Sequence, residues 1–209
     1  SALLEVMEER QTTVDGVTRK LPVPFIVLAT QNPLGSAGTQ MLPDSQMDRF
    51  MIKLGMGYPD LKSQINILKD RHRRNPLDEI NMITGREQLI KMQEAADAVY
   101  IADSVYEYIA RLADATRRNE MIQLGISPRG TLALCRMAKA YAFVTGRTFV
   151  IPEDVSAVFN DVCGHRIIVS PKAKIAERKA EDILADILRT EPVPQIRQEN
   201  ATGAEGKKR

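Results

Sequence analysis

Phe25-Ile26-Val27-Leu28-Ala29-Thr30 is the stretch of this sequence that most strongly indicates the fold. It is an unbroken, mostly apolar run that Pro24 precedes and Gln31-Asn32-Pro33 follows. A short continuous apolar run is typical of a strand that is buried on both faces of a parallel sheet. We therefore predict that residues 25–30 form a strand of an α/β domain.

The segments around this strand complete an α/β piece over residues 1–58. An amphipathic helix is predicted over 1–10, and the pair Asp15-Gly16 favours a two-residue hairpin turn between strands 11–14 and 17–20. Residues 34–43 are predicted to form a loop, and residues 44–49 form no more than a short helix. A second buried strand is predicted at 50–54. Two buried strands alone are marginal, so we expect the rest of the sheet to lie upstream of residue 1 in a longer parent protein.

After Pro59 the hydrophobic pattern becomes helical, which predicts an all-α domain over residues 60–190. Pro and Ser residues begin several of its helices, and Gly146 ends one. Helices are predicted over residues 86–96, 104–118 and 127–145. Further helices are predicted to begin near residues 61, 152 and 171. Residues 191–209 read as a flexible tail.

Composition excludes several classes of protein. With 209 residues, 44% hydrophobic and 27% charged, the chain is long and apolar enough to bury a core. A net charge of +2 is too small to imply a nucleic-acid or membrane-surface protein. The two cysteines and two histidines lack the spacing of a metal site, and no signal peptide or membrane span is recognisable. We expect a cytoplasmic protein without membrane insertion and with no metal ligand in this chain.

Three polar residues are candidates for chemistry. Asn32 follows the predicted strand at its carboxyl end, where ligands of parallel sheets bind, although an Asx turn before Pro33 would also explain it. Arg49 precedes the strand at 50–54 and is placed to reach a phosphate on a neighbouring subunit, or to pair locally with Asp44 or Asp48.

Arg129 conflicts with a general rule of helix electrostatics. Ser127 and Pro128 are good starting residues for a helix, so Arg129 falls in the first turn, where the macrodipole disfavours a cation by roughly 0.3 to 1 kcal/mol. A bound anion would remove the conflict, and full solvation would let the residue tolerate it. The chain contains no G-x-x-x-x-G-K-[ST] loop that would cradle phosphates.

Taken together, blocks of this sequence resemble the MoxR family of AAA+ ATPases. The resemblance extends in order from residue 1 to about residue 166. Its blocks are residues 1–11, Ala29-Thr30-Gln31-Asn32-Pro33, Gly38-Thr39, 42–50, Ser127-Pro128-Arg129, Gly146-Arg147, Pro152-Glu153-Asp154-Val155 and His165-Arg166.

The resemblance implies a fold and three roles. The fold is an α/β P-loop NTPase core of AAA+ type, lacking its N-terminal part here, followed by an all-α lid. Asn32 looks like sensor 1, which orients the attacking water, and Arg49 like the arginine finger that acts in trans. Arg129 looks like sensor 2, which touches the ATP phosphates, and the Asp15-Gly16 hairpin like the insertion before sensor 1.

The resemblance also implies an activity for the complete protein. It would bind ATP with Mg²⁺, assemble into a ring, expected to be hexameric, and remodel or mature protein partners, in this family often proteins with von Willebrand factor A domains. In the family, the Walker A and Walker B segments make most of the contacts to ATP and Mg²⁺, and they precede the position of residue 1. This chain alone is therefore expected to be inactive. The alternatives are a DNA-dependent motor, with Arg19 and Lys20 on the hairpin, and a non-catalytic helical interaction module.

Overall fold

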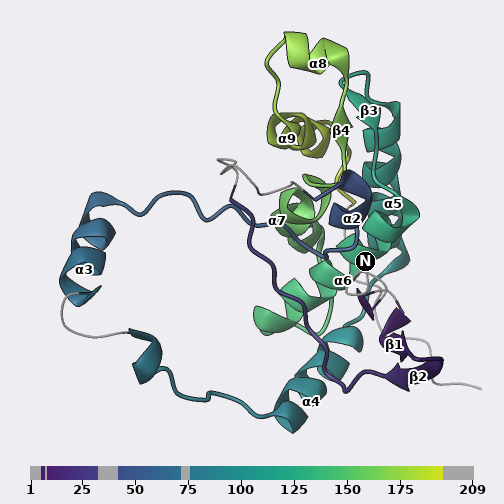
Figure 1. Cartoon of the computed structure of the whole chain (residues 1–209). Helices are drawn as coiled ribbons and strands as arrows, with labels where there is room; N and C mark the ends of the chain where they lie inside the picture. The colour runs from purple at the N-terminus through teal and green to yellow at the C-terminus, as the bar shows by residue number, and fades with distance from the viewer. Residues whose placement is uncertain (1–5, 8, 33–41, 72–75, 195–209) are drawn as a thin grey trace, which may run out of the picture. The chain divides into compact units, whose positions relative to one another are not determined.

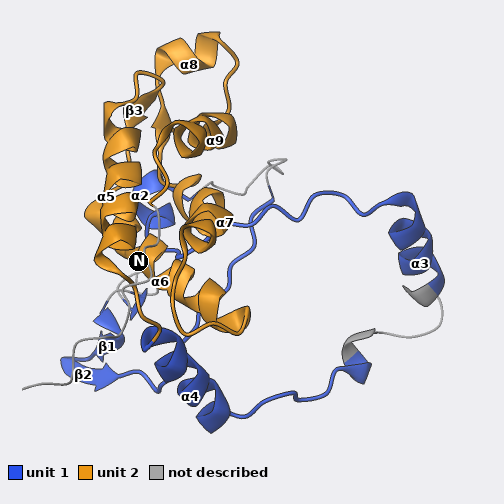
Figure 2. Ribbon diagram, turned by 180° about the vertical axis from the view of Figure 1, so that it is seen from behind, with its two compact units in different colours: residues 1–98 blue, residues 99–209 orange. Residues whose placement is uncertain are grey.

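The computed structural model describes residues 6–7, 9–32, 42–71 and 76–194 (Figure 1). The chain divides into two compact units, residues 1–98 and residues 99–209 (Figure 2). The predicted domain limits of 1–58, 60–190 and 191–209 follow the change from strand-like to helical sequence, and they stay a prediction beside this division.

The first unit contains the predicted hairpin. Strand β1 (Gln11–Val14) pairs antiparallel with β2 (Val17–Lys20), so that Val14 lies opposite Val17. Asp15 and Gly16 have φ values of 51° and 77°, the positive values that a type I′ turn needs at both central positions. The hydroxyls of Thr13 and Thr18 lie 3.0 Å apart across the strands. The hairpin prediction is confirmed.

The other elements of the first unit are short helices. They are α2 (Asp44–Met47), α3 (Leu61–Arg71), the 3₁₀ turn η1 (Pro76–Glu79) and α4 (Arg86–Asp97). At the start of α3 the Ser63 N–H donates to Asp60 Oδ1 at 2.7 Å, and this hydrogen bond lowers the pKa of the Asp60 carboxyl. The predicted loop at 34–43 and helix at 1–10 lie largely outside the described residues.

The predicted strands at 25–30 and 50–54 are wrong for this structure. Both segments are irregular, and their apolar side chains face solvent: Leu28 is 92% exposed and Leu54 is 61% exposed. A strand is defined by hydrogen bonds to a neighbouring strand, and among the described residues of this unit the hairpin is the only sheet. The apolar runs are real, but among the described residues neither run pairs with another strand.

The second unit is built from five helices among its described residues. They are α5 (Asp103–Arg118), α6 (Pro128–Val144), α7 (Pro152–Cys163), α8 (Pro171–Ile175) and α9 (Ala180–Thr190). The predicted helices at 104–118, 127–145 and 152 onward are confirmed, whereas the single helix expected from residue 171 is divided into α8 and α9. A small antiparallel pair, β3 (Ile122–Leu124) with β4 (Ile168–Val169), was not predicted.

The hydrophobic core lies in the second unit. Among the described residues, every buried apolar side chain falls between Val99 and Ile187. Burying one large apolar side chain contributes about 1.5 to 3 kcal/mol, so these helices have their own source of stability. The largest fully buried side chains include Tyr108, Ile109, Leu112, Leu134, Phe159 and Leu184. In the described part of the chain, no helix has both the length and the apolar character that crossing a bilayer requires.

Candidate functional site

Arg129 is exposed in the first turn of α6, where the sequence predicts it. The cap of this helix is well formed: Ser127 Oγ accepts the Gly130 N–H at 3.1 Å, and the Ser127 carbonyl accepts the Thr131 N–H at 3.0 Å. Pro128 occupies the first helical position and donates no hydrogen bond. The cap therefore fixes the backbone from which the Arg129 side chain projects.

The segment that leads into α6 is fixed to the end of α5. Thr116 is fully buried, and its hydroxyl donates to the Ala113 carbonyl at 2.6 Å and accepts the Ile126 N–H at 3.1 Å. Arg117 Nε donates to the Ile126 carbonyl at 3.1 Å. Gly125 lies so close to Arg117 that a Cβ would stand 2.8 Å from its backbone, so only glycine fits there.

Arg49 lies in a different setting from the one predicted. It is half-buried in the turn that follows the short helix α2, and its N–H donates to the Gln46 carbonyl at 3.3 Å. The predicted strand at 50–54, whose entry it was expected to occupy, is absent from this structure. The position after α2 still places Arg49 at the end of an element.

Asn32 is exposed and lies in a stretch without regular secondary structure. Asn32 and Arg49 belong to the first compact unit and Arg129 to the second. The convergence of these three side chains on one nucleotide is therefore a proposal.

Two other titratable groups of the second unit, Asp154 and Cys163, are buried. Asp154 is 1% exposed and forms an ion pair with Arg147, which raises the pKa of the Arg147 guanidinium, while Asp154 Oδ2 accepts the Ile151 N–H at 2.9 Å. Burial raises the pKa of the Cys163 thiol to about 12. Within the described ranges, no group of three or more His, Cys, Asp or Glu side chains is arranged to hold a metal ion.

Sequence reasoning missed the contacts that hold the start of α6. Thr116, Gly125, Gly130 and Arg166 all act on the start of α6 through contacts between segments. A glycine in the first turn of a helix was the one visible signal, because glycine there is unfavourable unless a close contact requires it.

Two known families match separate segments of the chain. The family described as "ATPase family associated with various cellular activities (AAA)" matches residues 1–52, which include Asn32 and Arg49. The "AAA lid domain" family matches residues 114–187, which include Arg129. The chain is thus the later part of an AAA-type α/β core followed by an all-α lid.

Individual relatives define the family more narrowly. The protein YeaC of Bacillus subtilis is 40% identical over 93% of this chain and 61% of its own length. The chaperone MoxR1 of Mycobacterium tuberculosis is 35% identical over 94% of this chain and 54% of its own length. A solved structure from Cytophaga hutchinsonii, described as a candidate ATPase, is 34% identical with a TM-score of 0.85 and covers 92% of this chain and 61% of its own.

The chain belongs to the MoxR family of AAA+ ATPases. It spans between about half and three fifths of the length of these relatives.

Proposed function

We propose that the complete protein hydrolyses ATP and uses the energy to remodel or mature protein partners. The observation that carries this proposal is Arg129, an exposed cation on the capped first turn of α6, in the segment that matches the AAA lid. The first-turn N–H groups of a helix and a guanidinium both favour an anion. Arg129 therefore fits the phosphates of ATP, as sensor 2 would.

Asn32 and Arg49 would act on the reaction itself. In the proposed site the Asn32 side chain orients the attacking water, and Arg49 of a neighbouring subunit stabilises the charge that develops on the transferred phosphoryl group. An arginine finger of this kind contributes about 10³ or more in rate. Asn32 is exposed, and Arg49 is half-buried in the turn that follows α2.

Magnesium would neutralise charge on the phosphate oxygens when bound with ATP. From the family resemblance, we propose that ATP and this ion are held mainly by residues upstream of this chain in the complete protein. For the same reason, and because the chain carries no G-x-x-x-x-G-K-[ST] loop, we expect the 209-residue chain alone not to hydrolyse ATP.

An arginine that acts in trans requires neighbouring copies in a ring. We propose a ring of subunits, expected to be hexameric, with the β1–β2 hairpin toward its pore and protein substrates, among them von Willebrand factor A-domain proteins. The name of the relative MoxR1, a chaperone, supports protein rather than nucleic acid as the substrate class.

The hairpin geometry does not favour the DNA-motor alternative. Arg19 lies opposite Thr12 and Lys20 lies opposite Gln11, so the two cations are on consecutive residues of one strand. Consecutive side chains of a strand point to opposite faces, and the two therefore form no shared basic face. A steep salt dependence of DNA binding by the complete protein would reverse this preference.

ATPase kinetics of the full-length protein test the proposal. We expect Asn32→Ala and Arg49→Ala each to lower kcat by about 10² to 10³, and Arg129→Ala to raise KM for ATP about tenfold or more. Lys53→Ala, which removes an exposed cation outside the proposed site, is the matched control and should leave both constants unchanged. Wild-type kinetics in all three site variants would contradict the proposed site, and a folded full-length protein without ATPase activity would contradict the proposed reaction.

A further inference from the structure

We propose that Arg166 is a positioning residue for Arg129. In this proposal its side chain holds the first turn of α6 against the end of α7 and so sets the direction in which Arg129 projects. The inference rests on the proposed function, in which Arg129 contacts the phosphates of ATP.

Arg166 is a buried cation just beyond α7. It is 7% exposed, and its backbone N–H donates to the Cys163 carbonyl at 3.0 Å. Its Nη1 donates to the carbonyl of Val162, in the last turn of α7. Cations are favoured at helix C-termini, where the last carbonyls lack helical partners, so the charge has a clear reason to lie there.

The stem of the same side chain lies directly on α6. A Cβ built on Gly130 would stand 2.9 Å from Arg166 Cδ and 3.4 Å from Nε. Real side chains essentially never approach so closely, so Gly130 has to be glycine for Arg166 to take this path. Gly130 directly follows Arg129, and its N–H closes the helix cap by donating to Ser127 Oγ. The Arg166 side chain therefore packs against Gly130, which is the neighbour of Arg129, the residue proposed to contact phosphate.

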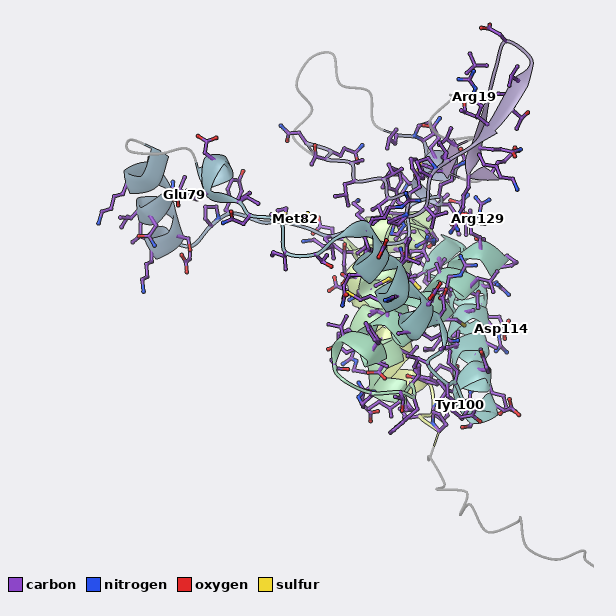
Figure 3. The ribbon with its side chains drawn as sticks, turned by 90° about the horizontal axis from the view of Figure 1, so that it is seen from below. Arg19, Glu79, Met82, Tyr100, Asp114 and Arg129 are labelled. Carbon is purple, nitrogen blue, oxygen red and sulfur yellow. The ribbon has the colours of Figure 1, made fainter. Side chains whose placement is uncertain are left out.

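An arginine side chain connects helices α6 and α7 at each end of the pair. Contact between Gly130 and Arg166 joins the start of α6 to the end of α7, whereas the Arg147–Asp154 ion pair joins the turn after α6 to the start of α7. The backbone of Phe149, in the turn between α6 and α7, pairs with that of Tyr100. Figure 3 shows Tyr100 well apart from Arg129. Arg147 thus supplies a control that weakens the same helix pair far from Arg129.

A fluorescent, slowly hydrolysed ATP analogue, titrated into the full-length protein, measures the effect. We expect Arg166→Met to raise its Kd about threefold to tenfold, and Arg166→Lys, which keeps a charged donor near the Val162 carbonyl, to recover most of the loss. Gly130→Ala keeps every charge and only displaces the Arg166 stem, so it should raise the Kd in the same way. Arg147→Met should lower the melting temperature without raising the Kd.

The double variant Arg129→Ala/Arg166→Met separates positioning from general stability. If Arg166 acts through Arg129, the double variant binds no more weakly than Arg129→Ala alone. A full additional loss in the double variant, or an equal loss in Arg147→Met, would overturn the inference.

The proposed function and this inference fail in different ways. An unchanged Kd in Arg129→Ala would remove the role of Arg129 in ATP binding, whatever Arg166 does. A raised Kd in Arg129→Ala, together with unchanged binding in both Arg166→Met and Gly130→Ala, would overturn the positioning role alone. If Arg166→Met does not fold, Gly130→Ala decides the question.

Discussion

Arg129 and Arg166 lie at opposite kinds of helix end, and the helix macrodipole acts on them with opposite sign. Arg166 at the end of α7 is stabilised by the carbonyl that it caps. Arg129 lies in the first turn of α6, at the helix end where the macrodipole disfavours a cation by roughly 0.3 to 1 kcal/mol. The macrodipole therefore accounts for the position of Arg166, whereas the helix end beside Arg129 favours an anion.

Cysteine reactivity is a second prediction at the residue scale. Cys163 is fully buried, and the pKa of its thiol is raised to about 12; Cys135 is half-buried, and burial raises its pKa as well. Because the thiolate is the reactive form, we expect iodoacetamide at pH 8 to label Cys135 slowly and Cys163 only after unfolding. Peptide mapping by mass spectrometry measures both sites, and rapid labelling of Cys163 in the folded protein would refute its assigned burial.

At the scale of elements, the turn between α6 and α7 depends on one buried carboxylate. Asp154 is 1% exposed, pairs with Arg147 and accepts the Ile151 N–H. We expect Asp154→Ala to lower the free energy of unfolding by about 2 kcal/mol or more, because it leaves a partly buried guanidinium without its carboxylate. Urea denaturation measures the change.

Asp186 on α9 provides the matched control. It pairs with Arg178 and Arg189, which lower the pKa of its carboxyl, but these groups lie at the surface. Surface ion pairs contribute little, so Asp186→Ala should change the unfolding free energy far less than Asp154→Ala. Equal effects of the two variants would mean that the Asp154 ion pair is no more important than a surface contact.

Elements whose signals are local were predictable from the sequence. The Asp15-Gly16 turn, the Ser127-Pro128 start of α6 and the Pro152 start of α7 each act on neighbouring residues, and all three predictions are confirmed. The strand predictions at 25–30 and 50–54 were wrong because a strand depends on a distant partner. The β3–β4 pair was missed for the same reason: its strands are two or three residues long and far apart in sequence.

The candidate site was predictable only in part. Arg129 is identifiable from its conflict with the helix terminus, whereas Asn32 and Arg49 gain specific roles only through the family resemblance. The contact between Gly130 and Arg166 joins residues 36 positions apart and follows no periodicity, so the glycine in the first turn hints at a close contact but does not identify Arg166 as the partner.

At the scale of the whole molecule, the core belongs to one unit. Because every buried apolar side chain of the described residues lies between Val99 and Ile187, we expect residues 99–194 to fold alone and to unfold cooperatively in urea. Residues 1–98 alone, with Leu28 and Leu54 exposed, should show no cooperative transition. Circular dichroism measures both, and a cooperative transition in residues 1–98 would show that this unit has a core of its own.

The central claim is that Asn32 of one subunit and Arg49 of its neighbour complete one ATP site, and mixing two inactive variants tests it most directly. In rings formed from equal amounts of full-length Asn32→Ala and Arg49→Ala, about a quarter of the interfaces combine an intact Asn32 with an intact Arg49. We therefore predict recovery of about a quarter of the wild-type ATPase rate. Mixing Asn32→Ala with the double variant Asn32→Ala/Arg49→Ala, which can form no complete site, should recover none. A mixture of the two single variants that is no more active than the average of its components would contradict the account.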